Sequence, residues 1–327
     1  MKALVPVAGM GTRLRPHTHT NPKALITVAG KPILGHILDH VVGLGIQDLV
    51  LVVGHMGDRI EAYVREHYGK RCRLAFVEQA ERQGLGHAVW LAREAVGDDE
   101  IFIILGDTIF EGDLRPMLEG TDSVLGVKEV DDPSRFGVAV RDENGVVTRL
   151  VEKPDYPVSR LALVGIYRVP RAALLMRCLD DLIRTNRRTR GEFQLTDALQ
   201  AMIDQGETMR TLPIDDWYDC GNPDTLLLTN RKLLTEMHTQ REVQGSILIP
   251  PVFVAEGARV EHSVVGPYVS LASGVVVRES VIRDTIVNEG ALVEQSLLRD
   301  SLIGDRAVVR GTYLKLNVGD SSEIDWS

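Results

Sequence analysis

The sequence is poor in cysteine and in aromatic residues, and it lacks long apolar runs. Its three cysteines, Cys72, Cys178 and Cys220, are far apart and odd in number. They therefore form neither a disulfide framework nor a Cys-x-x-Cys metal pair, and they favour a reducing, cytoplasmic location. No apolar stretch approaches the length of a membrane span, and the first residues lack a secretory signal pattern, so we expect no membrane partner.

Positive charge is also scarce, because 37 lysines and arginines stand against 46 aspartates and glutamates, which gives a net charge of −9. This balance argues against broad binding to nucleic acid. An anionic substrate would need local positive charge, which Arg13, Arg15, Lys23 and Lys153 can supply. At 327 residues the chain is long enough for one large domain or two.

The first 240 residues alternate between apolar runs typical of buried strands and patterns typical of helices. The predicted strands are 4–7, 48–53, 74–77 and 101–105, and the predicted helices are 33–44, 58–67 and 87–95. This alternation predicts an α/β domain over residues 1–240, with a Rossmann-like, mostly parallel sheet. Ligands of such sheets bind beyond the carboxyl ends of the strands, where Gly9, Gly11 and Asp107 fall.

Between residues 124 and 169 the pattern changes to short strands separated by turn signals. We expect strands at 136–140, 146–151 and 163–169 to extend the central sheet. Helices are then predicted at 171–184, 195–205 and 223–237. The arginine-rich stretch 187–190 is predicted to be a solvated loop rather than a nucleic-acid site.

Beyond residue 244 apolar residues recur at gaps of five or six, with small residues between them. The recurring positions are Val254, Val260, Val265, Leu271, Val277, Ile282, Val287, Val293, Leu298, Ile303 and Val309. This period is typical of hexapeptide repeats and predicts a left-handed parallel β-helix over residues 245–327, with about eighteen residues per triangular coil. An ordinary β-sandwich of short strands is the alternative, which the persistence of the period disfavours. The tail that ends in Trp326 is expected to cap a coil.

A glycine-rich turn with nearby cations follows the first predicted strand. Gly9 and Gly11 allow backbone N–H groups to approach phosphate oxygens closely, and Arg13 and Lys23 supply positive charge. Two familiar phosphate motifs do not fit. The dinucleotide fingerprint needs a third glycine where Leu14 stands, and a Walker A loop needs a lysine directly after its second glycine.

This turn resembles the signature of the sugar-1-phosphate nucleotidyltransferases, or NDP-sugar pyrophosphorylases, through Gly9-Met10-Gly11-Thr12-Arg13-Leu14-Arg15-Pro16 and the following Pro22-Lys23. The resemblance implies a fold of the nucleotide-diphospho-sugar transferase type. It also implies that Arg13 holds the leaving pyrophosphate and that Lys23 clamps the triphosphate. The nucleotide-binding residues it implies are Ala8, Gly9, Gly11, Thr12, Gln79 and Gly84.

The segment Gly84-Leu85-Gly86-His87-Ala88-Val89 resembles the base-recognition segment of that family. By this resemblance, the Gln79 amide and main-chain groups near Gly84 read the Watson–Crick edge of the base, since an amide both donates and accepts. The segment looks most like glucose-1-phosphate uridylyltransferases, whereas Leu14-Arg15-Pro16 and the hexapeptide tail look more like thymidylyltransferases. Both favour a pyrimidine. A plain helix start after a glycine is the structural alternative.

Two aspartates match the family's metal-binding positions: Asp107 after an apolar strand, and Asp219 in a Trp-x-Asp-x-Gly motif. A carboxylate at a strand end beside a phosphate loop is a suitable ligand for a hard cation, so the resemblance implies Mg²⁺. Either aspartate alone could instead cap a helix.

The segment Val151-Glu152-Lys153-Pro154 matches the family's sugar-phosphate motif. By that match Lys153 contacts the phosphate of the sugar-1-phosphate, and Glu152 accepts hydrogen bonds from sugar hydroxyls. The sugar-phosphate-binding residues that the resemblance implies are Gly137, Glu152, Lys153, Gly165 and Tyr167. Residues 191–197 resemble another family segment and are expected to form a wall of the sugar pocket.

The implied reaction is NTP plus sugar-1-phosphate giving NDP-sugar plus pyrophosphate, with dTTP or UTP and glucose-1-phosphate as first choices and GTP with mannose-1-phosphate next. Arg13, Lys23 and Lys153 are the predicted catalytic residues. Three rivals remain: an acyltransferase, for which His262 is the only histidine in the repeats; a non-catalytic NDP-sugar-binding regulator; and a tail that serves only for homo-oligomerisation, which is the role we expect of the repeats.

Overall fold

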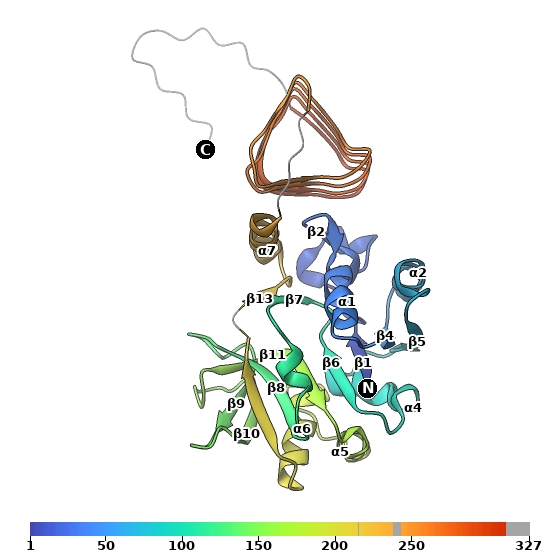
Figure 1. Cartoon of the computed structure of the whole chain (residues 1–327), viewed down its shortest axis with the longest axis vertical. Helices are drawn as coiled ribbons and strands as arrows, with labels where there is room; N and C mark the ends of the chain where they lie inside the picture. The colour runs from blue at the N-terminus through green and yellow to red at the C-terminus, as the bar shows by residue number, and fades with distance from the viewer. Residues whose placement is uncertain (215, 238–242, 312–327) are drawn as a thin grey trace. The chain divides into compact units, whose positions relative to one another are not determined.

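The computed structural model describes residues 1–214, 216–237 and 243–311 (Figure 1). The chain divides into two compact units. Unit 1 comprises Met1–Ile26 and Lys31–Thr229, and unit 2 comprises Thr27–Gly30 and Asn230–Ser327. A short N-terminal segment thus belongs to the C-terminal unit: the Ala29 N–H donates to Asn230 Oδ1 at 2.9 Å. The residues around Trp326, predicted to cap a coil, lie outside the described residues.

Unit 1 is built on a nine-stranded sheet whose central strands are parallel. Four of them lie in the order β6-β1-β4-β5, with the bounds β1 Lys2–Pro6, β4 Asp48–Val53, β5 Arg73–Glu78 and β6 Ile101–Ile104. Leu4 pairs with Val50 on one side and with Ile103 on the other, and all three are buried. Burial of both faces explains why these strands read as continuous apolar runs. The predicted Rossmann-like core is confirmed.

Antiparallel strands widen this sheet, as the sequence predicted. They are β8 Ser123–Glu129, β9 Gly137–Arg141, β10 Val147–Glu152 and β11 Leu161–Val169, and β12 Met209–Pro213 joins β8 in parallel. Strand β11 pairs antiparallel with β6, β8 and β9, so it connects the parallel core to the added strands.

Helices cover both faces of the sheet. Their bounds are α1 Ile33–Gly43, α2 Gly57–Tyr68, α3 Leu85–Leu91, α4 Arg93–Val96, α5 Ala172–Arg184 and α6 Leu195–Asp204. One core cluster joins Leu4 and Val50 to Val89 of α3, Leu175 of α5 and Leu199 of α6. Figure 1 shows α1 and α2 on the opposite side of these strands from α5.

The single helix predicted at 87–95 is instead two helices, α3 and α4. The Ala92 N–H donates to the Val89 carbonyl, a tighter bond over three residues that ends α3.

Short elements connect the main strands and helices of the chain. They are the 3-10 turns Thr12–Leu14, His17–His19, Lys23–Leu25 and Arg115–Leu118, and the strands β2 Thr27–Val28, β3 Lys31–Pro32, β7 Thr108–Glu111 and β13 Asp216–Asp219. Strands β7 and β13 pair antiparallel, and this pairing places Asp219 opposite Thr108, the residue after Asp107.

Helix α7 (Pro223–Glu236) leads into unit 2, whose short parallel strands form a parallel β-helix with the triangular outline seen in Figure 1. The strands are β14 Ile247–Leu248, β15 Val252–Val254, β16 Arg259–Glu261, β17 Val264–Val265, β18 Val269–Leu271, β19 Val276–Arg278, β20 Val281–Val287, β21 Leu292–Glu294, β22 Leu297–Ile303 and β23 Val308–Arg310.

The side chains predicted to fill the β-helix do so: all eleven recurring apolar positions belong to its core cluster or pack against it. Register shows the coil length directly, since Val260 pairs with Val277 and Val277 with Val293, separations of 17 and 16 residues. The expected eighteen residues per coil was therefore slightly too long, because each coil contains gaps of five as well as gaps of six. Among the described segments, no helix is long and apolar enough to cross a membrane.

Candidate functional site

Two adjoining cavities open at the carboxyl edge of the parallel strands in unit 1. The first cavity has a volume of about 500 Å³, and the second has a volume of about 850 Å³. Both are lined by Arg13, Leu105 and Asp107, so they meet at these three residues. This is the edge at which doubly wound sheets bind ligands, because the strand ends there leave loops and backbone groups free.

The two glycines of the N-terminal turn have different surroundings. Gly9 lines the first cavity, and a Cβ added to it would meet no atom within 4 Å. Gly11 has a φ of +59°, and an added Cβ would lie 2.8 Å from the Cβ of Lys23. Gly9 therefore leaves space for a ligand, whereas Gly11 makes a left-handed turn that packs against Lys23. Among the described residues lining the two cavities, neither Gly11 nor Thr12 is found.

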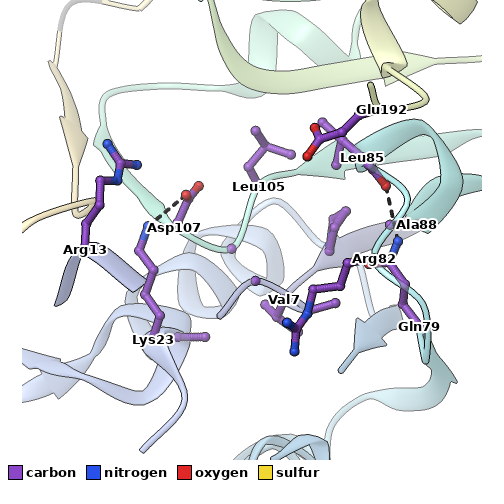
Figure 2. A pocket seen from close by; sticks show the side chains of 16 residues that line it. Val7, Arg13, Lys23, Gln79, Arg82, Leu85, Ala88, Leu105, Asp107 and Glu192 are labelled. Carbon is purple, nitrogen blue, oxygen red and sulfur yellow. Dashed lines mark hydrogen bonds and ion pairs between the residues drawn. The ribbon is translucent and has the colours of Figure 1, made fainter. Parts of the chain in front are cut away.

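An ion pair joins the two walls of the first cavity. Lys23 Nζ lies 2.8 Å from Asp107 Oδ2, and Figure 2 shows the lysine reaching across to the carboxylate. The Lys23 side chain is only 9% exposed, whereas that of Asp107 is 45% exposed. The ammonium group is thus fixed by its surroundings, and half of the carboxylate remains open to the cavity.

Asp107 and Asp219 are brought together by the β7–β13 pairing, and both line the second cavity. The Cys220 N–H donates to the Asp107 carbonyl at 3.1 Å, which ties the two strand ends together. At Gly221 an added Cβ would lie 2.7 Å from Asp219 Oδ1 and 2.9 Å from Arg13 Nη2, so this glycine lets the two side chains converge.

This donor set fits a hard divalent cation. Within the described part of the chain, no cluster of three or more histidine, cysteine or acidic side chains is arranged to hold a metal by itself. A cation at Asp107 and Asp219 would therefore need further ligands from water or from the bound molecules. Two carboxylates beside the glycine turn suit a cation that keeps several water ligands and takes the rest from a ligand's phosphates, as Mg²⁺ does.

The far end of the first cavity is formed by Gln79, Gly84 and a loop from later in the chain. Gly84 has a φ of +108°, and an added Cβ would lie 2.5 Å from the Phe193 carbonyl oxygen. The Phe193 N–H donates to the Gln83 carbonyl, and the Gly86 N–H donates to the Phe193 carbonyl, both at 2.8 Å. Of the described residues 191–197, expected to form a wall of the sugar pocket, only Glu192 lines a cavity, and that is the first one. The same residues hold the segment predicted to read the base.

Gln79 and His87 form a buried polar pair behind this end of the cavity. Gln79 Nε2 lies 3.2 Å from the Gly84 carbonyl oxygen and 3.2 Å from His87 Nδ1. Burial lowers the pKa of His87 below its ordinary value. The ring is therefore neutral at neutral pH.

Lys153 lines the second cavity from a strained backbone position, with a φ of +42°. Its N–H donates to the Phe136 carbonyl at 3.0 Å, and its ammonium lies 3.5 Å from Glu152 Oε1. The Thr196 hydroxyl donates to Glu152 Oε2 at 2.6 Å. An added Cβ on Gly137 would lie 2.9 Å from the same oxygen, so Glu152 is held against the wall rather than free in the cavity.

The other residues predicted to bind the sugar phosphate differ in whether they reach a cavity. Gly165 lines the second cavity, and an added Cβ would come within 2.6 Å of Leu105 Cδ1. Tyr167 is buried in the core cluster, and burial raises the pKa of its hydroxyl. Of the described residues, Tyr167, Gly137 and Glu152 are not among those lining either cavity.

Three arginines that sequence reasoning did not assign to the site line the cavities: Arg82 the first, and Arg135 and Arg190 the second. The Arg190 guanidinium donates to the Lys153 carbonyl at 2.8 Å and pairs with Asp155. Arg190 belongs to the stretch predicted to be a solvated loop, so that prediction misses its contact with the cavity. Its position directly before residues 191–197, already singled out, was the available signal.

Comparison with known proteins agrees with this geometry. A family model described as nucleotidyl transferase matches residues 2–236. Glucose-1-phosphate thymidylyltransferases of Streptomyces griseus and Streptomyces antibioticus are 34% and 36% identical to this chain, over 89% and 86% of its length and 88% and 81% of theirs.

A crystal structure described as a glucose-1-phosphate thymidylyltransferase of Bacillus anthracis, in complex with sucrose, superposes with a TM-score of 0.63. It is 27% identical and covers 74% of this chain and 98% of its own. Since the family model spans well over half of the sequence, and both Streptomyces relatives match most of their own length, the chain belongs to the nucleotidyl transferase family.

Proposed function

We propose that the protein transfers a nucleotidyl group from dTTP or UTP to a sugar-1-phosphate, with glucose-1-phosphate as the first candidate, and releases pyrophosphate. The observation that carries this proposal is the meeting of the two cavities at Arg13 and Asp107. One cavity then takes the nucleotide and the other takes the sugar phosphate. The α-phosphorus would lie where they join.

The reaction needs positioning and charge neutralisation rather than a base. A phosphate oxygen of the sugar-1-phosphate attacks the α-phosphorus, and the bond from that phosphorus to the bridging oxygen of the β-phosphate breaks. The electron pair leaves with pyrophosphate. The attacking oxygen is already ionised at neutral pH, so no proton has to move.

Each cation has a place in this scheme. Arg13 and Lys23 face the triphosphate from the first cavity, with Gly9 leaving room for its oxygens. Lys153 and Arg190 face the acceptor phosphate from the second cavity. Nucleotidyl transferases of this family generally use a divalent metal. We propose Mg²⁺ held by Asp107 and Asp219, which would neutralise phosphate charge when bound.

We also propose a separate role for each of the two parts of the chain. Residues 1–240 would carry the catalytic site and residues 245–327 a left-handed β-helix that joins copies of the chain. His262, the only histidine of the repeats, gives little support to acyl transfer. The cytoplasmic location of the protein stays a prediction from the three cysteines, which are free thiols.

Pyrophosphate release tests the proposal. The purified protein is assayed with Mg²⁺, five NTPs and several sugar-1-phosphates, beside an Asp107→Ala variant. Release with dTTP or UTP and glucose-1-phosphate, abolished in the variant, is the expected result. Folded protein that releases nothing across the panel would refute the activity and favour a regulator that binds NDP-sugars.

A further inference from the structure

The pair formed by Gln79 and His87 fixes which hydrogen-bonding group this protein offers to a base. Both side chains are buried, with 6% and 8% of their surface exposed. The Gln79 backbone N–H donates to the Val53 carbonyl at 2.8 Å, which anchors it at the end of β5. The His87 ring is close to the rings of Trp90 and Phe193, with centroids 5.9 and 6.5 Å away. Both side chains are thus packed inside the protein.

Hydrogen-bond chemistry assigns the two ends of the Gln79 amide. A carbonyl oxygen only accepts, so the group 3.2 Å from the Gly84 oxygen must be the NH₂. Its second hydrogen points to His87 Nδ1, also at 3.2 Å, which accepts only when that nitrogen carries no proton. Both donors of the amide are then used inside the protein.

The carbonyl end of the amide is left for a ligand. Across the described residues, Gln79 Oε1 has no hydrogen-bond donor, while Gln79 lines the first cavity. The site therefore presents an acceptor, and it would have to break an internal hydrogen bond to present a donor. The sequence predicted that the Gln79 amide both donates to and accepts from the base. This geometry leaves the amide only the accepting role.

We propose that His87 is a positioning residue that holds the Gln79 amide with Oε1 toward the base, so that the site selects bases with an N–H at the centre of the Watson–Crick edge. Uracil, thymine and guanine carry such an N–H. Cytosine and adenine carry a lone pair there, which would face another lone pair. This inference rests on the proposed nucleotide site, and it adds His87 as the residue that enforces the choice of base.

The protonation state of His87 supports the assignment. Burial favours its neutral form and lowers its pKa; Glu81, from the loop before α3, opposes this shift, and Arg188, from the loop before Phe193, adds to it. A lowered pKa means that the neutral ring persists to more acidic pH than an exposed histidine would allow. Once protonated, Nδ1 would point a hydrogen at the Gln79 NH₂, and the fixed orientation would be lost.

Two substitutions separate the acceptor from the packing. His87→Phe keeps an aromatic ring but removes the acceptor. His87→Asn places an amide oxygen at the same branch of the side chain and keeps an acceptor that does not titrate. Binding of UTP and CTP to the full chain, with Mg²⁺ and without sugar phosphate, is measured by calorimetry at pH 7.5 and pH 5.5, and thermal melting checks each variant for folding.

The wild type should bind UTP at least about a thousandfold more tightly than CTP, since a site built for an N–H rejects a ligand without it. His87→Phe should reduce this ratio about tenfold, as expected for one lost hydrogen bond. His87→Asn should restore the ratio, and this ratio should not fall at more acidic pH, where protonation of His87 would lower the ratio of the wild type. If His87→Phe does not fold, the wild-type base preference and the pH dependence of His87→Asn still decide the matter.

An unchanged ratio in His87→Phe, or wild-type affinities for UTP and CTP within tenfold, would overturn the inference. Selective UTP binding without pyrophosphate release on any acceptor would leave it standing while the proposed activity failed. Pyrophosphate release from CTP as fast as from UTP would support the proposed activity but overturn the inference about the base.

Discussion

Lys23 and Asp107 form an ion pair in the free protein, although both are assigned to incoming groups, the triphosphate and the metal ion. Lys23→Met should therefore lower kcat/KM about 100-fold or more, because one fixed cation is lost from the charged transition state. Stability should change by less than about 1 kcal/mol, since Asp107 is half exposed and can be hydrated. Steady-state kinetics and urea unfolding measure the two effects.

Lys31→Met provides the matched control, because Lys31 pairs with Asp39 away from both cavities. Its kinetic constants should equal those of the wild type. A comparable loss of activity in both variants would show that Lys23 acts through general stability rather than at the site.

Arg190 should act on the acceptor and not on the nucleotide. Arg190→Gln is expected to raise the KM for the sugar-1-phosphate about tenfold or more, because a charge-assisted hydrogen bond is lost. The KM for the NTP should stay the same. Arg187→Gln, an exposed arginine of the same loop that lines neither cavity, is the control. Initial rates with each substrate varied in turn distinguish the outcomes, and an equal rise in both KM values would contradict the assignment.

At the scale of elements, the turn into α3 depends on Gly84. Gly84→Ala combines a φ of +108° with a Cβ only 2.5 Å from the Phe193 oxygen. We expect it to lower the free energy of unfolding by about 2–4 kcal/mol and to weaken nucleotide binding, because the loop carrying Phe193 must move. Gly97→Ala also changes a glycine with a positive φ, here with a ψ of −139°, but no atom lies within 4 Å of the added Cβ. It should therefore cost only the backbone strain, about 1–3 kcal/mol, and leave nucleotide binding unchanged. Urea unfolding of both variants checks this, and equal losses would show that the close contact does not matter.

Sequence periodicity was sufficient for the elements themselves. The parallel strands of unit 1 are buried on both faces, so they read as continuous apolar runs. Each strand of the β-helix places an apolar side chain in the core, so these residues recur at regular gaps. The break between α3 and α4 was missed because a single hydrogen bond at Ala92 leaves no compositional signal.

The site was predictable where residues sit in contiguous motifs, as at Gly9, Arg13 and Lys23. Arg135 and Arg190 reach the second cavity from segments far from the glycine turn in sequence. The pairing of His87 with Gln79 is local, but it depends on the conformation of the turn between them. Gly11 stays a predicted nucleotide-binding residue, and its packing against Lys23 is a contact that only the backbone conformation reveals.

At the scale of the whole molecule, assembly through the β-helix can be tested on one exposed column. Ile247, Val264, Val281 and Leu297 follow one another in register. All but Val264 are exposed, and Leu297 is 84% exposed. If copies of the chain associate through this column, the wild type should sediment as an oligomer and Leu297→Glu should reduce the assembly, since the buried charge is unpaired. Val308→Glu, an exposed valine in a different sheet of the β-helix, is the control. Sedimentation of Leu297→Glu at the wild-type mass would exclude this column as the interface.

The register of the β-helix also determines which changes in chain length it can accept. Residues 260, 277 and 293 stack in one inward column, so a coil takes 17 or 16 residues. Loss or gain of a whole coil would leave every later side chain facing as before. Loss of one residue within a strand would turn the rest of that strand inside out. Genes for such tails can therefore grow or shrink in steps of one coil, and the tail length can vary between relatives without altering its inner pattern.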